Sequence, residues 1–265
     1  MKQKIISVEG VTLPDVWFQL VYNALKYGRD FKIDQGSFAG SVRKEFDFIV
    51  AHITRPFERD SEGFPLIPEV PEGSNLTPPV ERSYLAQYAP YLLTGEMAEG
   101  ESYTYGQRLN KEQLIRKTSN DLTKNDGIYR YYQGSKELTK IVNLVNKNLS
   151  QVDLAIEIYK KHPRTNQMCL QIAKPTDILL IDPPCLRHID TRIQDGKLHF
   201  YPYFRSWDLY SGFPANVAGI SMLQEYMANE IGVEQGEMIC TSKGLHLYDY
   251  CVSFAQMRCM VEDKY

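Results

Sequence analysis

The sequence predicts a mixed α/β fold, because segments with helical periodicity alternate with short apolar or strictly alternating segments of the kind that form strands. The chain has 265 residues, 43% of them hydrophobic, which suits one large domain or two small ones. No internal repeat, charge block or low-complexity stretch interrupts it. The expected class is therefore α/β (α+β), with the strand patterns concentrated in the second half.

The first half begins with a helix predicted over residues 14–27, where apolar residues recur along one face. Pro14 suits its first turn, and Gly28 lies just past its end. Residues 46–53 are predicted to form a largely apolar strand, and the basic residue Arg43 lies just before it.

A long ordered loop is expected next, because six prolines occur between residues 55 and 79 and exclude a helix or a central strand. Residues 84–93 are predicted to be helical, with a kink or break at Pro90. A further amphipathic helix is predicted over residues 136–149.

The second half carries the clearer strand signals. Short apolar runs predict strands over residues 168–173 and 178–181. Alternation predicts a strand over residues 197–205, with polar and aromatic side chains on one face. Because Pro202 cannot donate a backbone hydrogen bond, this strand is expected at a sheet edge or with a bulge nearby.

A third helix is expected to begin with Asn216 as its N-cap and to end at Gly232. Its apolar residues form a buried stripe, and Gln224 belongs to its polar face. The last expected element covers residues 244–251.

Composition and charge exclude several function classes. A formal charge of −3 provides no basic field for long nucleic acids, although a small anion at a local cluster remains open. Without a signal peptide or about 18 consecutive apolar residues, we expect a cytoplasmic protein with no membrane partner. The five cysteines form an odd set without metal-ligand spacing, which argues against a metal site or a disulfide framework.

Common enzyme motifs are missing from the sequence, which has no glycine-rich phosphate loop, no Gly-x-Ser-x-Gly elbow and no His-Glu-x-x-His helix. Four short motifs toward the end of the chain carry reactive or polar side chains instead. They are Pro183-Pro184-Cys185, Arg205-Ser206-Trp207-Asp208, Gly212-Phe213-Pro214-Ala215-Asn216 and His246-Leu247-Tyr248.

Each motif has a functional and a structural interpretation. Cys185 follows two prolines and lies beside basic residues that could lower the pKa of its thiol, so it is either a nucleophile or a small buried side chain. Arg205 and Ser206 suit a phosphate, whereas an ion pair of Arg205 with Asp208 is the structural alternative.

The motifs that contain Asn216 and the His246–Tyr248 pair are equally ambiguous when each is taken alone. The Asn216 amide offers a donor and an acceptor that match a pyrimidine edge, or it could only cap a helix. His246 and Tyr248 share one face of an extended segment and could both donate to a sugar hydroxyl, or they could belong to the core.

In this order and spacing, the motifs resemble the folate-dependent thymidylate synthase family. The short archaeal-type branch, which shades into the nucleotide hydroxymethylases, is matched best by Tyr103-Thr104-Tyr105-Gly106-Gln107-Arg108, Phe213-Pro214-Ala215-Asn216-Val217 and Leu223-Gln224-Glu225-Tyr226. The resemblance covers residues 103–248 well and the first hundred residues loosely. It implies a single domain over residues 1–265, a three-layer fold with a large mixed sheet, and a homodimer paired sheet to sheet.

The resemblance also implies one-carbon transfer to a pyrimidine nucleoside monophosphate. Cys185 would add to the C6 carbon of the base, which makes C5 a nucleophile toward 5,10-methylenetetrahydrofolate or a related methylene-tetrahydropterin. Tyr105 matches the tyrosine that helps to remove the C5 proton through water. Asp208 matches a position near the O2 edge of the base, and Arg205 matches a phosphate ligand near the nucleophile.

The remaining substrate contacts follow from the same resemblance. Ser206 matches a second phosphate ligand, and Arg43 a mobile phosphate arginine. His246 and Tyr248 match the pair that binds the ribose 3′-hydroxyl. Asn216 matches the base-reading amide and favours dUMP, because related deoxycytidylate hydroxymethylases carry an aspartate there.

Three departures from the family pattern bear on these expectations. Asn166 and Gln167 replace an arginine pair that reaches the phosphate across the dimer, so a cation from another loop would have to substitute. Leu186 stands where the family has a histidine, and Tyr88 where it has a glutamate.

Alternatives to dUMP methylation therefore stay open. The longer synthases close a C-terminal tail over the folate, whereas this sequence ends at Tyr265, and a wetter site would favour water over hydride. The alternative reaction is that of a CMP or dCMP 5-hydroxymethylase. A non-catalytic nucleotide-binding protein is a third hypothesis, motivated by the missing arginine pair.

Overall fold

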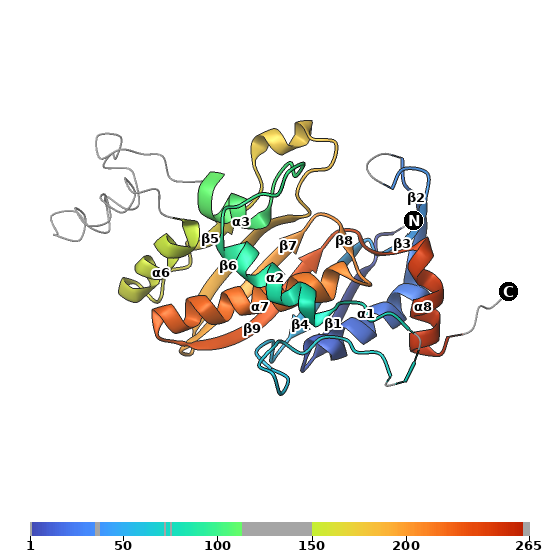
Figure 1. Ribbon diagram of the computed structural model, residues 1–265, viewed down its shortest axis with the longest axis horizontal. Coiled ribbons are helices and arrows are strands. Elements are labelled where there is room, and N and C mark those ends of the chain that lie inside the picture. The colour runs from blue at the N-terminus through green and yellow to red at the C-terminus, as the bar shows by residue number, and fades with distance from the viewer. Residues whose placement is uncertain (1, 35–37, 72, 75, 113–149, 262–265) are drawn as a thin grey trace.

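The computed structural model describes residues 2–34, 38–71, 73–74, 76–112 and 150–261, and Figure 1 shows their arrangement. The helix predicted over residues 136–149 lies outside these ranges. Within them, the chain forms two sheets and the helices that pack against them.

A six-stranded sheet is the largest element of the fold. In spatial order its strands are β1 (Ile5–Gly10), β4 (Phe48–Ile53), β9 (Glu234–Ser242), β7 (Lys197–Phe204), β6 (Leu186–Gln194) and β5 (Cys169–Gln171). β1 and β4 run parallel, as do β7 and β9, whereas the other neighbours are antiparallel. The large mixed sheet that the resemblance implies is therefore confirmed.

A four-stranded sheet brings distant site residues together. In spatial order its strands are β2 (Arg29–Lys32), β3 (Val42–Glu45), β10 (Leu245–Tyr248) and β8 (Trp207–Asp208). The antiparallel register of β3 and β10 sets Arg43 opposite Tyr248. The parallel register of β10 and β8 sets His246 opposite Asp208. Residues from three separate parts of the sequence thus become neighbours in one small sheet.

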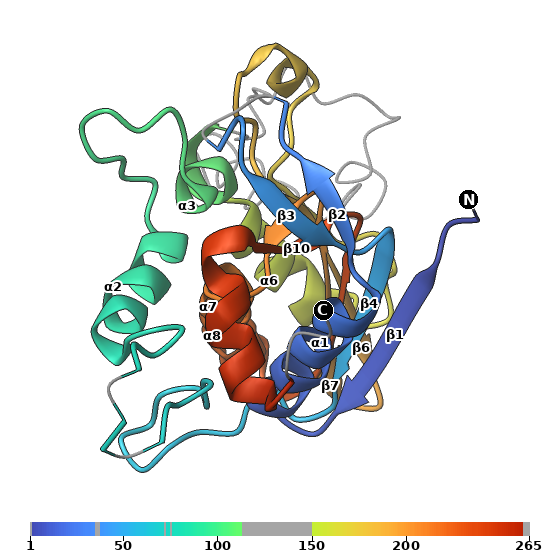
Figure 2. The ribbon, with the colours of Figure 1, turned by 90° about the vertical axis from the view of Figure 1, so that its right-hand side faces the viewer.

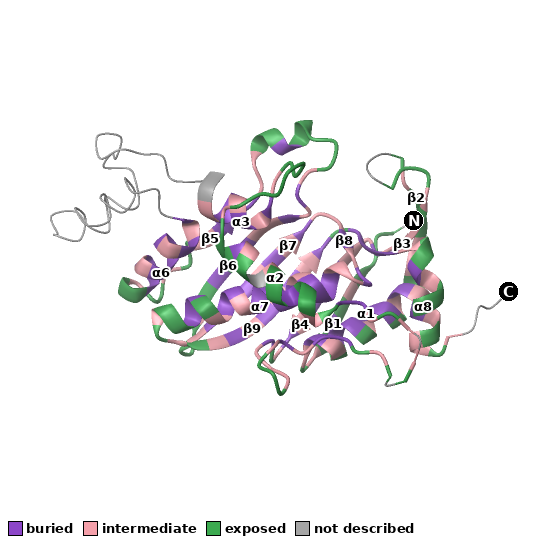
Figure 3. Cartoon of the chain, in the orientation of Figure 1, coloured by how far each residue is buried: buried purple, intermediate pink, exposed green. Residues whose placement is uncertain are grey.

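Helices form two layers on one face of the large sheet. They are α1 (Leu13–Tyr27), α2 (Arg82–Leu93), α3 (Tyr105–Gln107) with the π-helical turn η1 (Arg108–Glu112), α6 (Gln151–Lys161), α7 (Gly212–Ile231) and α8 (Asp249–Cys259). α7 contacts β7 and β9 on its inner side and α2 on its outer side, so that sheet, α7 and α2 are successive layers (Figure 2). Buried residues gather along α7 and the strands behind it (Figure 3). The predicted three-layer α/β class is confirmed.

The N-terminal helix forms where it is predicted, and its ends show why. Thr12 and Asp15 make a capping box, in which the Asp15 N–H donates to the Thr12 hydroxyl and the Thr12 N–H donates to the Asp15 carboxylate at 2.9 Å. Pro14 lies in the first turn, where its missing N–H costs nothing, and Gly28 ends the helix.

The proline-rich loop and the helix after it also agree with the prediction. Apart from residues 72 and 75, which are not described, residues 55–79 contain only an isolated bridge between Arg59 and Pro65. α2 continues through Pro90, so the helix is present as predicted but does not break there. The strand expected over residues 168–173 is present as the shorter β5.

α7 ends as predicted but begins earlier. Gly232 adopts a φ of 86°, a left-handed conformation that glycine tolerates best, and its N–H closes the helix on the Ala228 carbonyl. The prediction that Asn216 is the N-cap is wrong, because the helix already starts at Gly212. Gln224, expected on the polar face, is fully buried and donates to the Leu198 carbonyl at 2.7 Å.

β7 is not an edge strand, because it pairs with β6 on one side and β9 on the other. Pro202 pairs with Ile189 of β6, whereas the register with β9 has partners at Phe200 and Tyr203 but none at Pro202. Both pairings of β7 contain a register shift, which agrees with the expected irregularity. A central strand can therefore include this proline because pairing is interrupted beside it.

The strand predicted over residues 178–181 is wrong. Residues Pro175–Leu179 form a 3₁₀ helix, η2, and the Ile178 and Ile181 side chains are 87% and 88% exposed. The buried Asp177 holds this turn, because its carboxylate accepts the Lys174 N–H at 2.8 Å. A local hydrogen bond therefore overrides the apolar pattern.

Candidate active site

Cys185 lies just before β6, on a turn that two prolines constrain. The Arg205 N–H donates to the Cys185 carbonyl at 2.8 Å, which ties the end of β7 to the cysteine. The Arg205 guanidinium donates to the Pro183 and Pro184 carbonyls at 3.1 and 3.3 Å and to the Asp182 carboxylate at 3.0 Å. The fold therefore brings the predicted nucleophile and the predicted phosphate arginine together, and the ion-pair partner of Arg205 is Asp182 rather than Asp208.

The electrostatic surroundings of Cys185 differ from the expectation. Burial raises the pKa of its thiol, and the positive charges of Arg205, Arg187 and Arg43 oppose this only in part. The sequence-based expectation of a lowered pKa is wrong for this arrangement, because the thiol is desolvated more than the arginines compensate.

Tyr105 lies beside the nucleophile at the start of α3. Its hydroxyl accepts the Leu186 N–H at 3.3 Å, one residue after Cys185. Burial and the nearby thiol raise the pKa of Tyr105 well above its ordinary value, and burial raises that of the adjacent Tyr103 to about 12. Both phenols therefore stay protonated at neutral pH and can donate a hydrogen bond or pass a proton through water.

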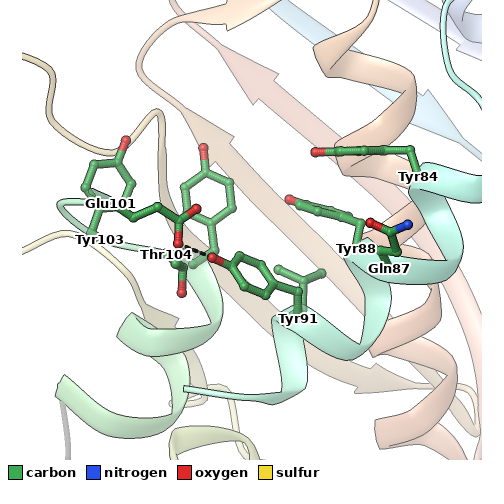
Figure 4. A pocket seen from close by; sticks show the side chains of 9 residues that line it. Tyr84, Gln87, Tyr88, Tyr91, Glu101, Tyr103 and Thr104 are labelled. Atoms are coloured by element: carbon green, nitrogen blue, oxygen red, sulfur yellow. Dashed lines mark hydrogen bonds between the residues drawn. The ribbon is translucent and has the colours of Figure 1, made fainter. Parts of the chain in front are cut away.

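An aromatic cavity of about 390 Å³ opens between α2 and the segment that carries these tyrosines. Its walls are Tyr84, Gln87, Tyr88, Tyr91, Leu92, Glu101, Tyr103, Thr104 and Tyr105. Tyr84 and Tyr88 stack with ring centroids 5.6 Å apart, and the Tyr91 hydroxyl donates to Glu101 (Figure 4). Parallel aromatic faces with a few polar groups suit a flat, conjugated ring.

Asn216 lies in the second turn of α7, between the cavity and β8. Its Oδ1 accepts the Trp207 indole N–H at 2.9 Å, and its Nδ2 donates to the Tyr88 hydroxyl at 2.8 Å. Trp207 uses only one of the two lone pairs on Oδ1, and Tyr88 uses only one of the two N–H groups on Nδ2. Asn216 therefore keeps one acceptor and one donor position for a ligand.

Asp208 holds the start of α7. Its carboxylate accepts three backbone N–H groups, from Tyr210 at 3.0 Å, Ser211 at 3.3 Å and Gly212 at 2.9 Å. Burial nevertheless raises its pKa. Asp208 thus positions Asn216 through the helix that it caps, in the role that the sequence had suggested for Asn216 itself.

His246 and Tyr248 lie together on β10, with ring centroids 4.6 Å apart at 81°. His246 Nδ1 lies 2.8 Å from the Gly244 carbonyl, which can only accept, so Nδ1 carries the proton. Burial lowers the pKa of His246 to about 4, which leaves Nε2 an acceptor at neutral pH. Nε2 has no hydrogen-bond partner among the described residues. The pair would thus accept from a hydroxyl at His246 and donate at Tyr248, instead of donating at both.

A basic cleft of about 570 Å³ lies beside this pair. Its walls carry Ser206, four basic side chains and three carboxylates, so positive charge is only in slight excess. The basic residues are Lys32, Arg43, Arg205 and Lys243, and the acidic ones are Asp34, Glu45 and Asp47. Glu45 pairs with Arg43 at 2.6 Å, and burial raises the pKa of this carboxyl. The predicted phosphate residues Arg43, Arg205 and Ser206 are therefore brought to one place, as an anion site requires.

Stability should fall in mild acid because of His246. The folded-state pKa is about 4 and the ordinary value 6.5, so below pH 6.5 the unfolded chain binds a proton that the folded protein does not. This contribution is complete above pH 6.5, and about 3 kcal/mol is lost by pH 4. Urea denaturation of the wild type and His246→Gln between pH 7 and pH 4 tests this. Parallel curves for the two proteins would contradict the assignment.

No group of three or more His, Cys, Asp or Glu side chains is arranged to hold a metal ion in the described part of the chain. No helix of residues 2–112 or 150–261, where these are described, has both the length and the apolar character needed to cross a membrane.

Several residues of the site escaped the sequence reasoning. Trp207 lies within the Arg205-Ser206-Trp207-Asp208 motif, but the motif itself indicates no role for it, and Lys243 belongs to none of the four motifs. The stacked tyrosines had a readable signal, because positions 84, 88 and 91 recur at the spacing of one helix face. No local pattern indicates that Trp207 would contact Asn216.

Fold and site together define a class of α/β protein in which a cysteine lies between a basic cleft and an aromatic cavity. The thymidylate synthase family model matches residues 102–263. Archaeal relatives named "Putative thymidylate synthase" include one from Methanosarcina acetivorans, 26% identical over 248 residues, covering 93% of this chain and 90% of the relative. Another, from Methanothermobacter thermautotrophicus, is 24% identical over 250 residues, covering 92% and 93%.

The family model spans more than half of the chain, including Tyr105, Cys185, Asn216 and His246. The chain belongs to the thymidylate synthase family. Membership indicates a one-carbon transferase that acts on a pyrimidine nucleotide, with methylene-tetrahydrofolate as the usual cofactor of the family.

Proposed function

We propose that the protein methylates the C5 carbon of dUMP to give dTMP, with 5,10-methylenetetrahydrofolate or a related methylene-tetrahydropterin. The observation that supports this most is the position of Cys185. The thiol is close enough to Tyr103 and Tyr105 in the aromatic cavity, and to Arg43 and Arg205 in the basic cleft, to interact electrostatically with each. A nucleotide with its phosphate in the cleft would thus present its base to the thiol and to a ring in the cavity.

The first step asks Cys185 to lose its proton and attack C6. A sulfur–carbon bond forms at C6, and the electrons of the C5–C6 double bond move toward C5 and the C4 carbonyl oxygen. Arg205 favours the thiolate, and the Asn216 N–H can donate to the oxygen that gains charge. We assign to Tyr105 the positioning of the water that later takes the C5 proton and passes it to solvent. The phenol stays protonated, accepts the Leu186 N–H and can donate its own hydrogen to that water.

The sugar and phosphate would be held on the other side of the cysteine. The His246 Nε2 acceptor and the Tyr248 hydroxyl suit a ribose 3′-hydroxyl, and Arg43, Arg205 and Ser206 suit the phosphate. Asp208 would lie near the O2 edge of the base, at the end of β8.

The pterin would lie in the aromatic cavity. Tyr84, Tyr88 and Tyr103 offer ring faces, and Gln87 and Glu101 offer polar groups to its edge. When bound there, this cofactor would supply both the one-carbon unit and the hydride that reduces it to a methyl group. The tyrosine walls would exclude water from one side of the base.

Lys243 should supply part of the positive charge that binds the phosphate, in place of the missing arginine pair. It precedes Gly244 in the turn between β9 and β10, lines the cleft with Arg205 and Ser206, and interacts electrostatically with Glu45. Lys243→Ala is expected to raise the KM for dUMP about tenfold, since a hydrogen bond to a charged group contributes about 1.5–3 kcal/mol.

The matched control for Lys243→Ala is Lys197→Ala, which removes an exposed lysine paired with Glu234 at 3.1 Å. Steady-state kinetics should give the control an unchanged KM. An unchanged KM in Lys243→Ala, with normal turnover, would show that the phosphate lies elsewhere.

We further propose a cytoplasmic homodimer in which each chain is one domain. The face of the large sheet away from α7 carries His199, Tyr201 and Tyr203, all half-buried, and would pair with the same face of a second copy. All five cysteines are free thiols, which suits a reducing compartment. Sedimentation analysis of wild type and Tyr201→Glu tests the pairing.

The reaction is tested by incubating the protein with methylenetetrahydrofolate and each of dUMP, dCMP, UMP and CMP, and identifying products by mass. A methylated product from dUMP supports the proposal, and its absence rejects it. Tritium release from C5 of a cytosine nucleotide, without release from dUMP, would instead establish the CMP or dCMP 5-hydroxymethylase reaction.

A further inference from the structure

Three polar side chains from separate elements form a short hydrogen-bonded chain at the base site. Trp207 of β8 donates its indole N–H to Asn216 Oδ1 at 2.9 Å. Asn216 of α7 donates from Nδ2 to the hydroxyl of Tyr88, on α2, at 2.8 Å. Tyr88 and Asn216 are 128 positions apart, so only the folded chain brings them together.

The donors in this chain determine which way the Asn216 amide faces. An indole N–H can donate but never accept, so the amide oxygen must face Trp207. The amide nitrogen then faces Tyr88, whose oxygen accepts. Turning the amide over would set its N–H₂ against the indole N–H and leave a buried donor without an acceptor, which is costly in a site shielded from water.

Packing prevents the two neighbours of Asn216 from moving aside. Trp207 is 2% exposed and stacks on Phe204, with ring centroids 3.7 Å apart at 5°. Tyr88 passes over Gly219 so closely that a Cβ there would lie 2.4 Å from its ring carbons. Both hydrogen-bonding partners are therefore held by surrounding side chains before any ligand binds.

The remaining hydrogen-bonding capacity fits one type of base edge. Asn216 keeps a second lone pair on Oδ1 and a second N–H on Nδ2, and the Tyr88 hydroxyl keeps its own hydrogen. Burial raises the pKa of Tyr88, so this hydrogen is present at neutral pH. An acceptor beside two donors matches the N3–H and C4 carbonyl of uracil. Cytosine presents an unprotonated N3 and a C4 amino group, which would need the amide turned over.

We propose that Trp207 and Tyr88 are positioning residues that make the site selective for a base with a C4 carbonyl and an N3–H. Trp207 fixes the direction of the Asn216 amide, and Tyr88 adds a donor to the carbonyl. The inference rests on the proposed function, because it assumes that Asn216 faces the base. It assigns the preference for uracil to two residues that are not themselves the base-reading amide.

Direct binding separates this inference from the reaction. Isothermal titration of the full chain with dUMP and with dCMP, without a pterin, gives the ratio of the two dissociation constants. Trp207→Phe keeps the stacked ring but removes the N–H, and should lower the preference for dUMP about tenfold, mainly by improving dCMP binding. Trp17→Phe is the matched control, because Trp17 is equally buried and donates to the Leu209 and Tyr210 carbonyls.

A second variant protects the test against a folding defect in Trp207→Phe. Tyr88→Phe should also lower the dUMP preference, here by weakening dUMP binding several-fold. Tyr159→Phe, which removes a buried hydroxyl bonded to Thr191 at 2.8 Å outside the site, should leave the ratio unchanged. A ratio that stays at the wild-type value in Tyr88→Phe and in folded Trp207→Phe overturns the inference, while the proposed function stands. Failure of the wild type to bind either nucleotide overturns both.

Discussion

Cys185→Ser is expected to lower the turnover of dUMP by a factor on the order of 10³ or more, because a serine hydroxyl is a far weaker nucleophile than a thiolate. The residues around position 185 offer no strong base to activate a hydroxyl, since Tyr103 and Tyr105 stay protonated. Binding of dUMP should change only a few-fold, because the arginines and the amide remain. Product formation followed by mass and binding followed by calorimetry measure the two quantities.

The matched control for this prediction is Cys169→Ser. Cys169 is also a half-buried free thiol, and burial raises its pKa to about 11, but it lies on the edge strand β5 opposite Asp190, five positions along the chain from Cys185. Its replacement should leave turnover within about twofold of wild type. Equal turnover in Cys185→Ser and wild type would remove Cys185 from the mechanism. A wild type that binds dUMP without any turnover would support the hypothesis of a non-catalytic nucleotide-binding protein.

Elements whose ends are set by neighbouring residues could be predicted from the sequence. The capping box of Thr12 and Asp15 and the left-handed Gly232 act within a few residues, so local patterns locate α1 and the end of α7. β6 and β9 were not predicted, because their exposed faces carry charged residues and their order depends on pairing with β7. Residues 178–181 were assigned wrongly, since an apolar run alone does not distinguish a strand from an exposed turn.

The site likewise has features that the sequence predicts and features that only the folded structure shows. Motif order was enough to group Cys185 with Arg205, and β10 keeps His246 and Tyr248 two residues apart on one strand. The contacts that orient these groups depend on long-range packing. No sequence signal links Tyr88 with Asn216, and the proton position on His246 follows from a carbonyl that only the turn at Gly244 presents.

Asp177→Asn is expected to destabilise the protein by about 3–5 kcal/mol. Asp177 is 1% exposed, and its Oδ1 accepts from the buried Arg108 at 3.0 Å. Its Oδ2 lies 3.4 Å from the Arg187 guanidinium and accepts the Lys174 N–H. Removing the carboxylate charge leaves Arg108 buried beside a neutral amide, and breaking a buried ion pair from one side carries a cost of this size.

The same change should weaken catalysis beyond its effect on folding. Arg187 also donates to the Pro184 carbonyl at 3.2 Å, so the carboxylate braces the chain on both sides of Cys185. Urea denaturation gives the free energy of unfolding. Kinetics measured without urea, at a temperature where the variant is folded, gives kcat. Glu234→Gln, which breaks the exposed pair with Lys197, should change the free energy of unfolding by less than about 1 kcal/mol.

Replacing both partners separates the two contributions. In Arg108→Met with Asp177→Leu, apolar side chains would fill the space of the ion pair, and such replacements are often neutral or stabilising. We expect the double variant to recover most of the lost stability but not the lost turnover, because Arg187 then has no carboxylate to hold it beside Pro184. Recovery of both stability and turnover in the double variant would mean that Asp177 contributes only to folding. Unchanged stability and turnover in Asp177→Asn would mean that its carboxylate supports neither the fold nor the segment around Cys185.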